Sequence, residues 1–113
     1  MPSTSPLGEF EVVVLLAVLH LLQSNDDAFG SAIRDEIERR SGRRVPRGSI
    51  YVTLDRLEEK GLLTSRLAGS ASGRDGRPKR LFRVTASGLR MVKHSVRLLS
   101  GMSVGLEPLL GER

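Results

Sequence analysis

Hydrophobic positions recur with helical spacing in four segments of the chain and alternate with polar positions in two others. Apolar residues three and four apart form one face of a helix, whereas alternation places them on one face of a strand. Helices are therefore predicted over residues 7–23, about 28–41, 47–60 and 86–100, and strands over 62–67 and 80–85. Glycines and a proline interrupt the remaining C-terminal tail.

The first predicted helix is apolar on nearly every face. Pro6 suits the first turn of a helix and Ser5 can cap it, so the helix is expected to run from Leu7 to Gln23. A helix that is hydrophobic all round must be covered all round. Since three other small helices supply little cover, the pattern favours a partner chain.

Each of the other predicted helices carries one apolar stripe. The second helix follows a turn at residues 24–27 and ends at Gly42, a residue type typical of the position after a helix. Thr85 or Ser87 can cap the last helix, whose stripe has spacings of 3, 4 and 3 and is suited to pairing with another helix. The stripes are Phe29, Ile33 and Ile37 in the second helix, Ile50, Leu54 and Leu57 in the third, and Leu89, Val92, Val96 and Leu99 in the last.

The composition is that of one globular domain and argues against catalysis. The chain has 113 residues, of which 39% are hydrophobic, so residues 1–113 are expected to form a single domain. It has no cysteine, which excludes disulfide scaffolds, zinc fingers and cysteine nucleophiles. His20 and His94 alone leave too little material for a metal site or a general base. We expect no enzymatic activity, no metal and no cofactor.

The most apolar run does not predict a membrane span. Val12–Leu22 has 11 residues, well short of the about 20 that cross a bilayer. Glu9 and Glu11 precede it, where a secretory signal would carry positive charge. We therefore expect a cytoplasmic protein.

Charge is distributed unevenly along the chain. The net charge is +5, and 15 of the 18 basic residues are arginine. Residues 1–42 carry 3 basic and 7 acidic side chains, whereas residues 43–100 carry 14 basic and 4 acidic ones. Such concentrated positive charge is typical of a protein that binds a polyanion, and arginine suits the forked recognition of phosphate and guanine.

Helix, turn, helix and then a basic hairpin is the element order of a winged helix-turn-helix, a mostly α fold with a small β-hairpin (α+β). We expect this unit over residues 7–85, a dimerisation helix over 86–100 and a tail over 101–113. The third helix would enter the major groove, which is about 12 Å wide. The hairpin loop would follow the phosphate backbone or enter the minor groove.

The candidate DNA contacts lie on the third helix and in the hairpin. Arg47 and Arg56 are the candidates for guanine, and Val52 or Thr53 for thymine methyl groups. The Tyr51 ring can pack on the body while its hydroxyl reaches a phosphate. The full set is Arg47, Ser49, Tyr51, Val52, Thr53, Arg56, Arg74, Arg77, Lys79 and Arg80.

Three segments resemble the PadR family of transcriptional regulators. Gly48–Leu63 (GSIYVTLDRLEEKGLL) is similar to the family's third-helix signature and Ala28–Ile33 to the opening of its second helix. Gly76–Gly88 (GRPKRLFRVTASG) resembles its wing and the start of its last helix. The resemblance extends over about residues 7–99. It implies a homodimeric winged-helix repressor of the small class, which dimerises through its first and last helices.

The expected function is therefore sequence-specific DNA binding by a homodimer. A two-fold dimer implies a pseudo-palindromic operator with half-sites about 10 bp apart, or a multiple of that spacing. Members of this class can hold flat hydrophobic ligands at the dimer interface, so a small hydrophobic effector is a further candidate partner. The candidate dimer contacts are Phe10, Val14, Val18, Leu89, Val92, Val96 and Leu99.

Two other interpretations use the same features. A winged-helix module can bind an acidic protein with its basic face, in which case duplex DNA would bind weakly and without saturation. Alternatively, the chain could be a ligand-gated sensor whose main function is a pocket in the dimer, with DNA release as its output.

Overall fold

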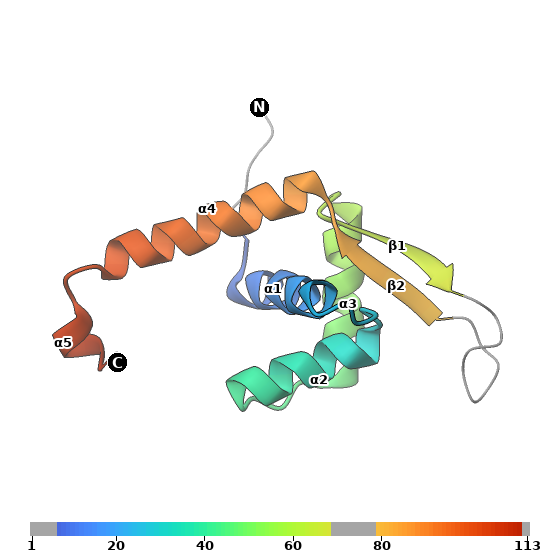
Figure 1. Ribbon diagram of the computed structural model, residues 1–113, viewed down its shortest axis with the longest axis horizontal. Helices are drawn as coiled ribbons and strands as arrows, with labels where there is room; N and C mark the ends of the chain where they lie inside the picture. The colour runs from blue at the N-terminus through green and yellow to red at the C-terminus, as the bar shows by residue number, and fades with distance from the viewer. Residues whose placement is uncertain (1–6, 69–78, 112–113) are drawn as a thin grey trace.

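The computed structural model describes residues 7–68 and 79–111, which form a helical body with a hairpin on one side and a long helix extending from the other (Figure 1). The mostly helical composition with one antiparallel hairpin confirms the predicted α+β class. The elements are α1 (Glu9–Gln23), α2 (Gly30–Ser41), α3 (Arg47–Glu59), β1 (Leu63–Ala68), β2 (Lys79–Val84), α4 (Ala86–Ser103) and α5 (Glu107–Leu110).

α1 lies at the centre of the body and packs against α2, α3, α4 and β2. Val14 and Val18 are 0% exposed, and Leu15 is equally buried between them. The chain itself therefore supplies much of the cover that the sequence assigned to a partner. This corrects the prediction for Val14 and Val18, which are core residues with no surface left for a dimer contact.

The start of α1 is stabilised by its own first turn. The backbone N–H of Gly8 donates a hydrogen bond to Glu11 Oε1 at 3.0 Å, which satisfies a group that would otherwise lack a partner at the helix terminus. The helix begins at Glu9, two residues later than predicted. The predicted cap, Ser5, and Pro6 lie outside the described residues.

α2 also begins later than its pattern suggests. Phe29 is the N-cap and pairs with Leu81 of β2 as an isolated antiparallel bridge, while the N–H of Phe82 donates to the carbonyl oxygen of Ala28 at 3.0 Å. Phe29 therefore belongs to a short extension of the hairpin rather than to the helical stripe. The other end agrees with the prediction, because Gly42 follows the helix with a φ of +75°.

β1 and β2 pair in antiparallel fashion, with Leu63 opposite Val84 and Ala68 opposite Lys79. Leu63 and Phe82 are buried in the core. The observed bounds differ from the predicted ones by one residue at each end. The loop was predicted over residues 68–79, but Ala68 and Lys79 belong to the strands, and residues 69–78 lie outside the described residues.

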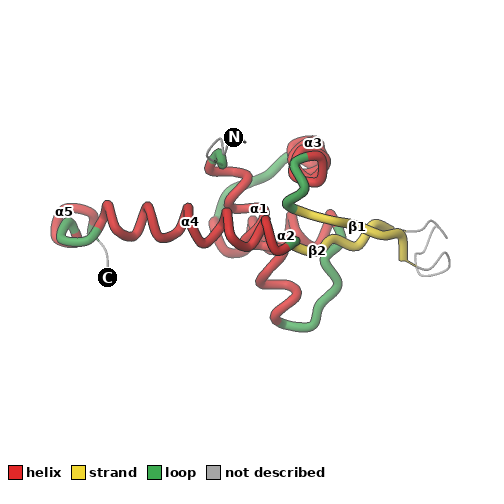
Figure 2. The backbone as a smooth tube through the Cα atoms, turned by 90° about the horizontal axis from the view of Figure 1, so that it is seen from above, coloured by secondary structure: helices red, strands yellow, loops and turns green. Residues whose placement is uncertain are grey.

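α4 is longer than predicted and projects beyond the body, as Figure 2 shows. It continues through Gly101 to Ser103, and α5 follows at Glu107–Leu110, so the tail that was expected to be irregular contains helical residues in its described part. Within residues 7–68 and 79–111, no helix combines the length and hydrophobicity needed to cross a bilayer.

The base of α4 is fixed to the turn that precedes β1. Thr85 is the cap, because its Oγ1 accepts from the N–H of Gly88 at 3.0 Å and donates to the carbonyl oxygen of Gly61 at 2.7 Å. The N–H of Thr85 donates to the carbonyl oxygen of Leu62 at 3.1 Å. A Cβ on Gly88 would lie only 2.2 Å from that same Leu62 oxygen, so α4 and the turn meet backbone to backbone.

Candidate nucleic-acid interface

α3 has one buried and one exposed face. Ile50, Leu54 and Leu57 are completely buried, as their spacing predicted, and they dock the helix on α1 and the hairpin. The opposite face is open from the first turn of the helix to the last. Four of the predicted DNA contacts are exposed on α3, namely Arg47, Ser49, Val52 and Arg56. Arg47 and Arg56 are nine residues, or about two and a half turns, apart, so they lie on opposite sides of the helix.

Thr53 does not belong to this open face. Its exposed fraction is 6%, and it lies three residues after Ile50 and four before Leu57, on the buried side of α3. The prediction that Thr53 faces the groove is therefore corrected. Val52, which is 55% exposed, is the one of the two positions that a thymine methyl group could reach.

Tyr51 packs its ring on the start of α2. A Cβ built on Gly30 would lie 2.6 Å from the Tyr51 hydroxyl oxygen and 2.7 Å from Cε1 and Cζ, so only glycine leaves room for this ring. Tyr51 is nevertheless 37% exposed. The expected packing on the body is observed, and a contact between the hydroxyl and phosphate stays a prediction.

Two residues of α2, Arg34 and Glu38, hold the start of α3 in place, and the sequence analysis assigned neither of them a role. Arg34 Nε donates to the carbonyl oxygen of Val45 at 2.7 Å, and the N–H of Val45 donates to Glu38 Oε2 at 2.6 Å. Arg34 and Glu38 are also an i,i+4 ion pair at 3.7 Å. Their spacing could have indicated that pair, but not its shared partner in the turn before α3.

A second ion pair holds the other end of α3. Lys60 Nζ lies 2.8 Å from Glu11 Oε2, joining the residue after α3 to the buried first turn of α1. Burial alone would raise the pKa of Glu11, but the hydrogen bonds from Lys60 and the Gly8 N–H outweigh it and lower that pKa. Glu11 therefore stays ionised, and α3 is fixed at both ends.

The hairpin, called the wing below, carries exposed cations at Arg66, Lys79 and Arg83. The Lys79 ammonium lies 5.3 Å from the centre of the Phe29 ring, a cation–π contact that holds the base of β2 near the start of α2. The predicted contacts Arg74 and Arg77 lie outside the described residues.

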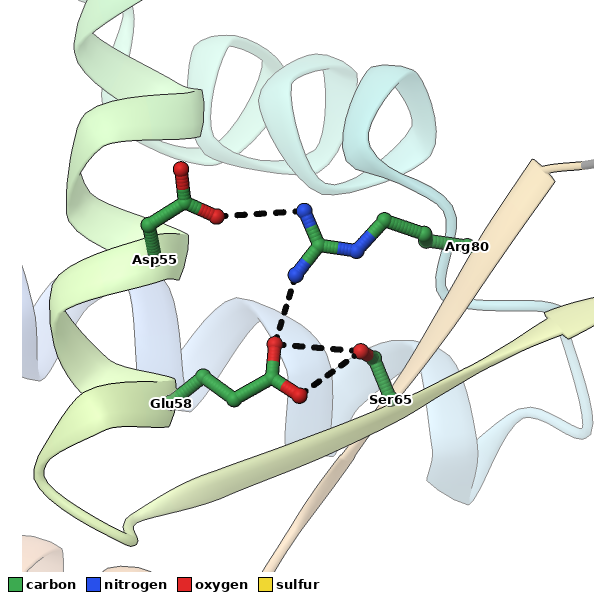
Figure 3. A network of polar contacts seen from close by, with 4 residues as sticks. All are labelled: Asp55, Glu58, Ser65 and Arg80. Carbon is green, nitrogen blue, oxygen red and sulfur yellow. Dashed lines mark hydrogen bonds and ion pairs between the residues drawn. The ribbon is translucent and has the colours of Figure 1, made fainter.

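Arg80 differs from these cations because its guanidinium is turned toward α3 (Figure 3). Arg80 Nη1 donates to Asp55 Oδ1 at 3.1 Å and Nη2 to Glu58 Oε1 at 2.5 Å. Burial lowers the pKa of Arg80, yet the hydrogen bonds to Asp55 and Glu58 together raise it. Ser65 Oγ completes the group by donating to Glu58 Oε2 at 2.8 Å. These four residues are called the Arg80 network below.

The predicted dimer contacts separate into core and surface residues. Val92 is 3% exposed and packs into the body, which corrects its assignment to a seam between chains. Phe10 is partly buried at the edge of the core. Other large apolar side chains that the prediction did not include are exposed nearby. The exposed apolar residues of this region are Leu89, Val96, Leu98, Leu99, Met102, Val104, Leu106, Leu109 and Leu110.

The family model of the transcriptional regulator PadR-like family matches residues 18–94, which include α2, α3, the wing and half of α4. The chain belongs to the PadR family. It is accordingly a DNA-binding transcriptional regulator, and the prediction that it is not an enzyme agrees with this assignment. No curated protein sequence matches the chain at a significant level.

Solved PadR-family structures share the fold over most of their length. A PadR family transcription regulator from a hypervirulent Clostridium difficile has a TM-score of 0.73 at 18% identity, with 91% of this chain and 99% of that chain covered. A PadR-like regulator from Bacillus cereus has a TM-score of 0.69 at 19% identity, covering 92% and 93%. A PadR family regulator from Eggerthella lenta has 26% identity and a TM-score of 0.61, covering 87% and 83%.

Proposed function

We propose that this PadR-family protein is a homodimeric repressor that binds a pseudo-palindromic operator. The observation that carries the proposal is the exposure of Arg47, Ser49, Val52 and Arg56 on α3, a helix that is docked by its apolar side and held at both ends. Arginine can bind guanine through two hydrogen bonds, and Val52 can contact a thymine methyl group.

The second element of the proposal is a dimer formed through α4 and α5. Leu99 is 66% exposed and Leu109 is 82% exposed, and with their apolar neighbours they leave the projecting end of the chain without cover. A second copy that packs there would remove this surface from water, at about 25 cal/mol for each Å² of apolar area. A small hydrophobic effector at the same interface is a further proposal that rests on these side chains.

The first experiment is selection from a randomised duplex library, followed by fluorescence anisotropy with the selected duplex. We expect a two-fold symmetric site, and we expect R56A to weaken binding by about tenfold or more through loss of a guanine contact. V52A and T53S are a matched pair, because each removes methyl groups at adjacent positions. Only V52A should weaken binding, since Thr53 faces the core.

Equal binding to every duplex would contradict this proposal. It would favour the other interpretation, in which the basic face binds an acidic protein, and a pull-down would then be the next step. The dimer is tested separately by light scattering at micromolar concentration, where Leu99→Asp should produce monomers. A wild-type protein that is monomeric under these conditions would refute the dimer.

A further inference from the structure

We propose that Arg80 is a positioning residue, which holds the wing against α3, and that it is not itself a DNA contact. This role rests on the proposed function, since it concerns how the two DNA-facing elements keep their relative placement. It also replaces the sequence-based prediction, which counted Arg80 among the basic residues that contact DNA.

The strand register directs Arg80 toward α3. Arg80 lies opposite Leu67 in the antiparallel pair, and Ser65 lies opposite Phe82. Directly paired residues share a face of a hairpin, and alternate residues along one strand share it too. Arg80 is thus on the same side as Phe82, the side buried against the body, whereas Arg66 and Arg83 are on the opposite side.

Both strands are tied to the same carboxylate of α3. Arg80 from β2 donates to Glu58 at 2.5 Å, and Ser65 from β1 donates to both Glu58 oxygens at 2.8 and 3.0 Å. Arg80 makes its second hydrogen bond to Asp55, which lies three residues earlier on α3. Its guanidinium also lies 4.8 Å from the centre of the Phe82 ring. The side chain is therefore constrained by three contacts.

The charge of Arg80 is already compensated by this network. Two carboxylates accept from one guanidinium, so the group of Asp55, Glu58 and Arg80 has a net charge of −1. A phosphate that approached Arg80 would also approach both carboxylates, and the net negative charge of the group would repel it. Arg56 is exposed on α3 and is not a member of the Arg80 network, which makes it the better candidate for a DNA contact.

The decisive variant is Glu58→Gln, which makes the protein more positive but removes the carboxylate that joins Arg80 and Ser65. If Arg80 contacts DNA directly, freeing its charge should strengthen operator binding. If Arg80 positions the wing, E58Q should weaken binding, by up to about fivefold for a pair of this exposure. Tighter binding by E58Q would overturn the inference.

Two further measurements compare Arg80→Met with Lys79→Met, a matched removal of charge from the adjacent residue of β2. Loss of one phosphate contact makes the negative slope of log K (the association constant for DNA) against log salt concentration shallower by about 0.9. K79M should show this change and R80M should not. In the free protein, amide hydrogen exchange of β1 and β2 should accelerate more in R80M, which loses two hydrogen bonds to α3, than in K79M, which loses one cation–π contact. A reduced salt slope for R80M with unchanged exchange would assign Arg80 to DNA.

The exchange measurement needs no DNA, so it separates this inference from the proposed function. A wild-type protein that binds no duplex would refute the proposed function, while faster hairpin exchange in R80M and E58Q would still establish the tie between wing and helix. If R80M does not fold, Arg80→Lys replaces it. Lysine can pair with Glu58 but lacks the second donor arm for Asp55, so an intermediate exchange rate is expected.

Discussion

Replacing Gly88 with alanine is expected to destabilise the protein because the new methyl group would meet backbone atoms. Its Cβ would lie 2.2 Å from the carbonyl oxygen of Leu62, 3.1 Å from the carbonyl carbon and 2.9 Å from Val84 Cγ1. The two Leu62 atoms cannot rotate away, so α4 must move off the turn. Overpacking lowers the free energy of unfolding by about 1–3 kcal/mol or more. The higher helix preference of alanine offsets at most about 1 kcal/mol of this loss. Because a 2.2 Å contact with a backbone oxygen belongs at the upper end of the overpacking range, a net loss of about 2 kcal/mol is expected.

Gly101→Ala is the matched control, because Gly101 lies in the same helix and, among the described residues, no atom beyond its chain neighbours and the nearby helix backbone lies within 4 Å of its added Cβ. Here only the helix preference acts, and stability should rise by up to about 1 kcal/mol. Urea denaturation at two protein concentrations measures both variants and detects any contribution from assembly. A G88A protein as stable as the wild type would refute the claim of a close backbone approach at this position.

Two other predictions concern the cap of α4 and a buried carboxylate. Thr85→Ala should cost about 1 kcal/mol in denaturation because Gly88 loses its acceptor, and Thr85→Ser, which keeps the hydroxyl, should cost less. Hydrogen bonds from Arg40, and then Arg39, hold the pKa of Glu36 in the folded protein below 4.5 despite burial. The stability that ionised Glu36 contributes is therefore complete above pH 4.5, and it is lost as the pH falls through the pKa of the folded state. Denaturation between pH 6 and 3 should show a smaller loss for Glu36→Gln, and equal losses would contradict this role.

Features that depend on local spacing were predictable from the sequence. Ile50, Leu54 and Leu57 identify the docked face of α3, and Gly42 marks the end of α2, because both signals lie within one or two turns of helix. The start of α2 was not predictable in the same way. Phe29 leaves the helical stripe because its backbone pairs with Leu81, a residue far along the chain.

The candidate site shows the same division. Thr53 lies at helical spacing from the buried Ile50 and Leu57, so local spacing could have assigned it to the docked side of α3 and left Val52 as the exposed position. Composition identifies Arg80 as a cation of a basic hairpin, but its partners Asp55 and Glu58 come from another element. For α1, a pattern that is apolar on every face contains no information about which face its own chain covers.

The joint between α4 and the wing has a mechanical consequence. Thr85 is hydrogen-bonded to the backbone of residues 61–62, and Gly88 packs closely against the same backbone. The start of α4 therefore cannot tilt without moving the start of β1. From Gly88 to Ser103, α4 is a rigid arm of about 22 Å at 1.5 Å per residue. A displacement of about 2 Å at its free end is a rotation of about 5° at the joint. The placement of the far end of α4 is therefore coupled to the placement of the start of β1.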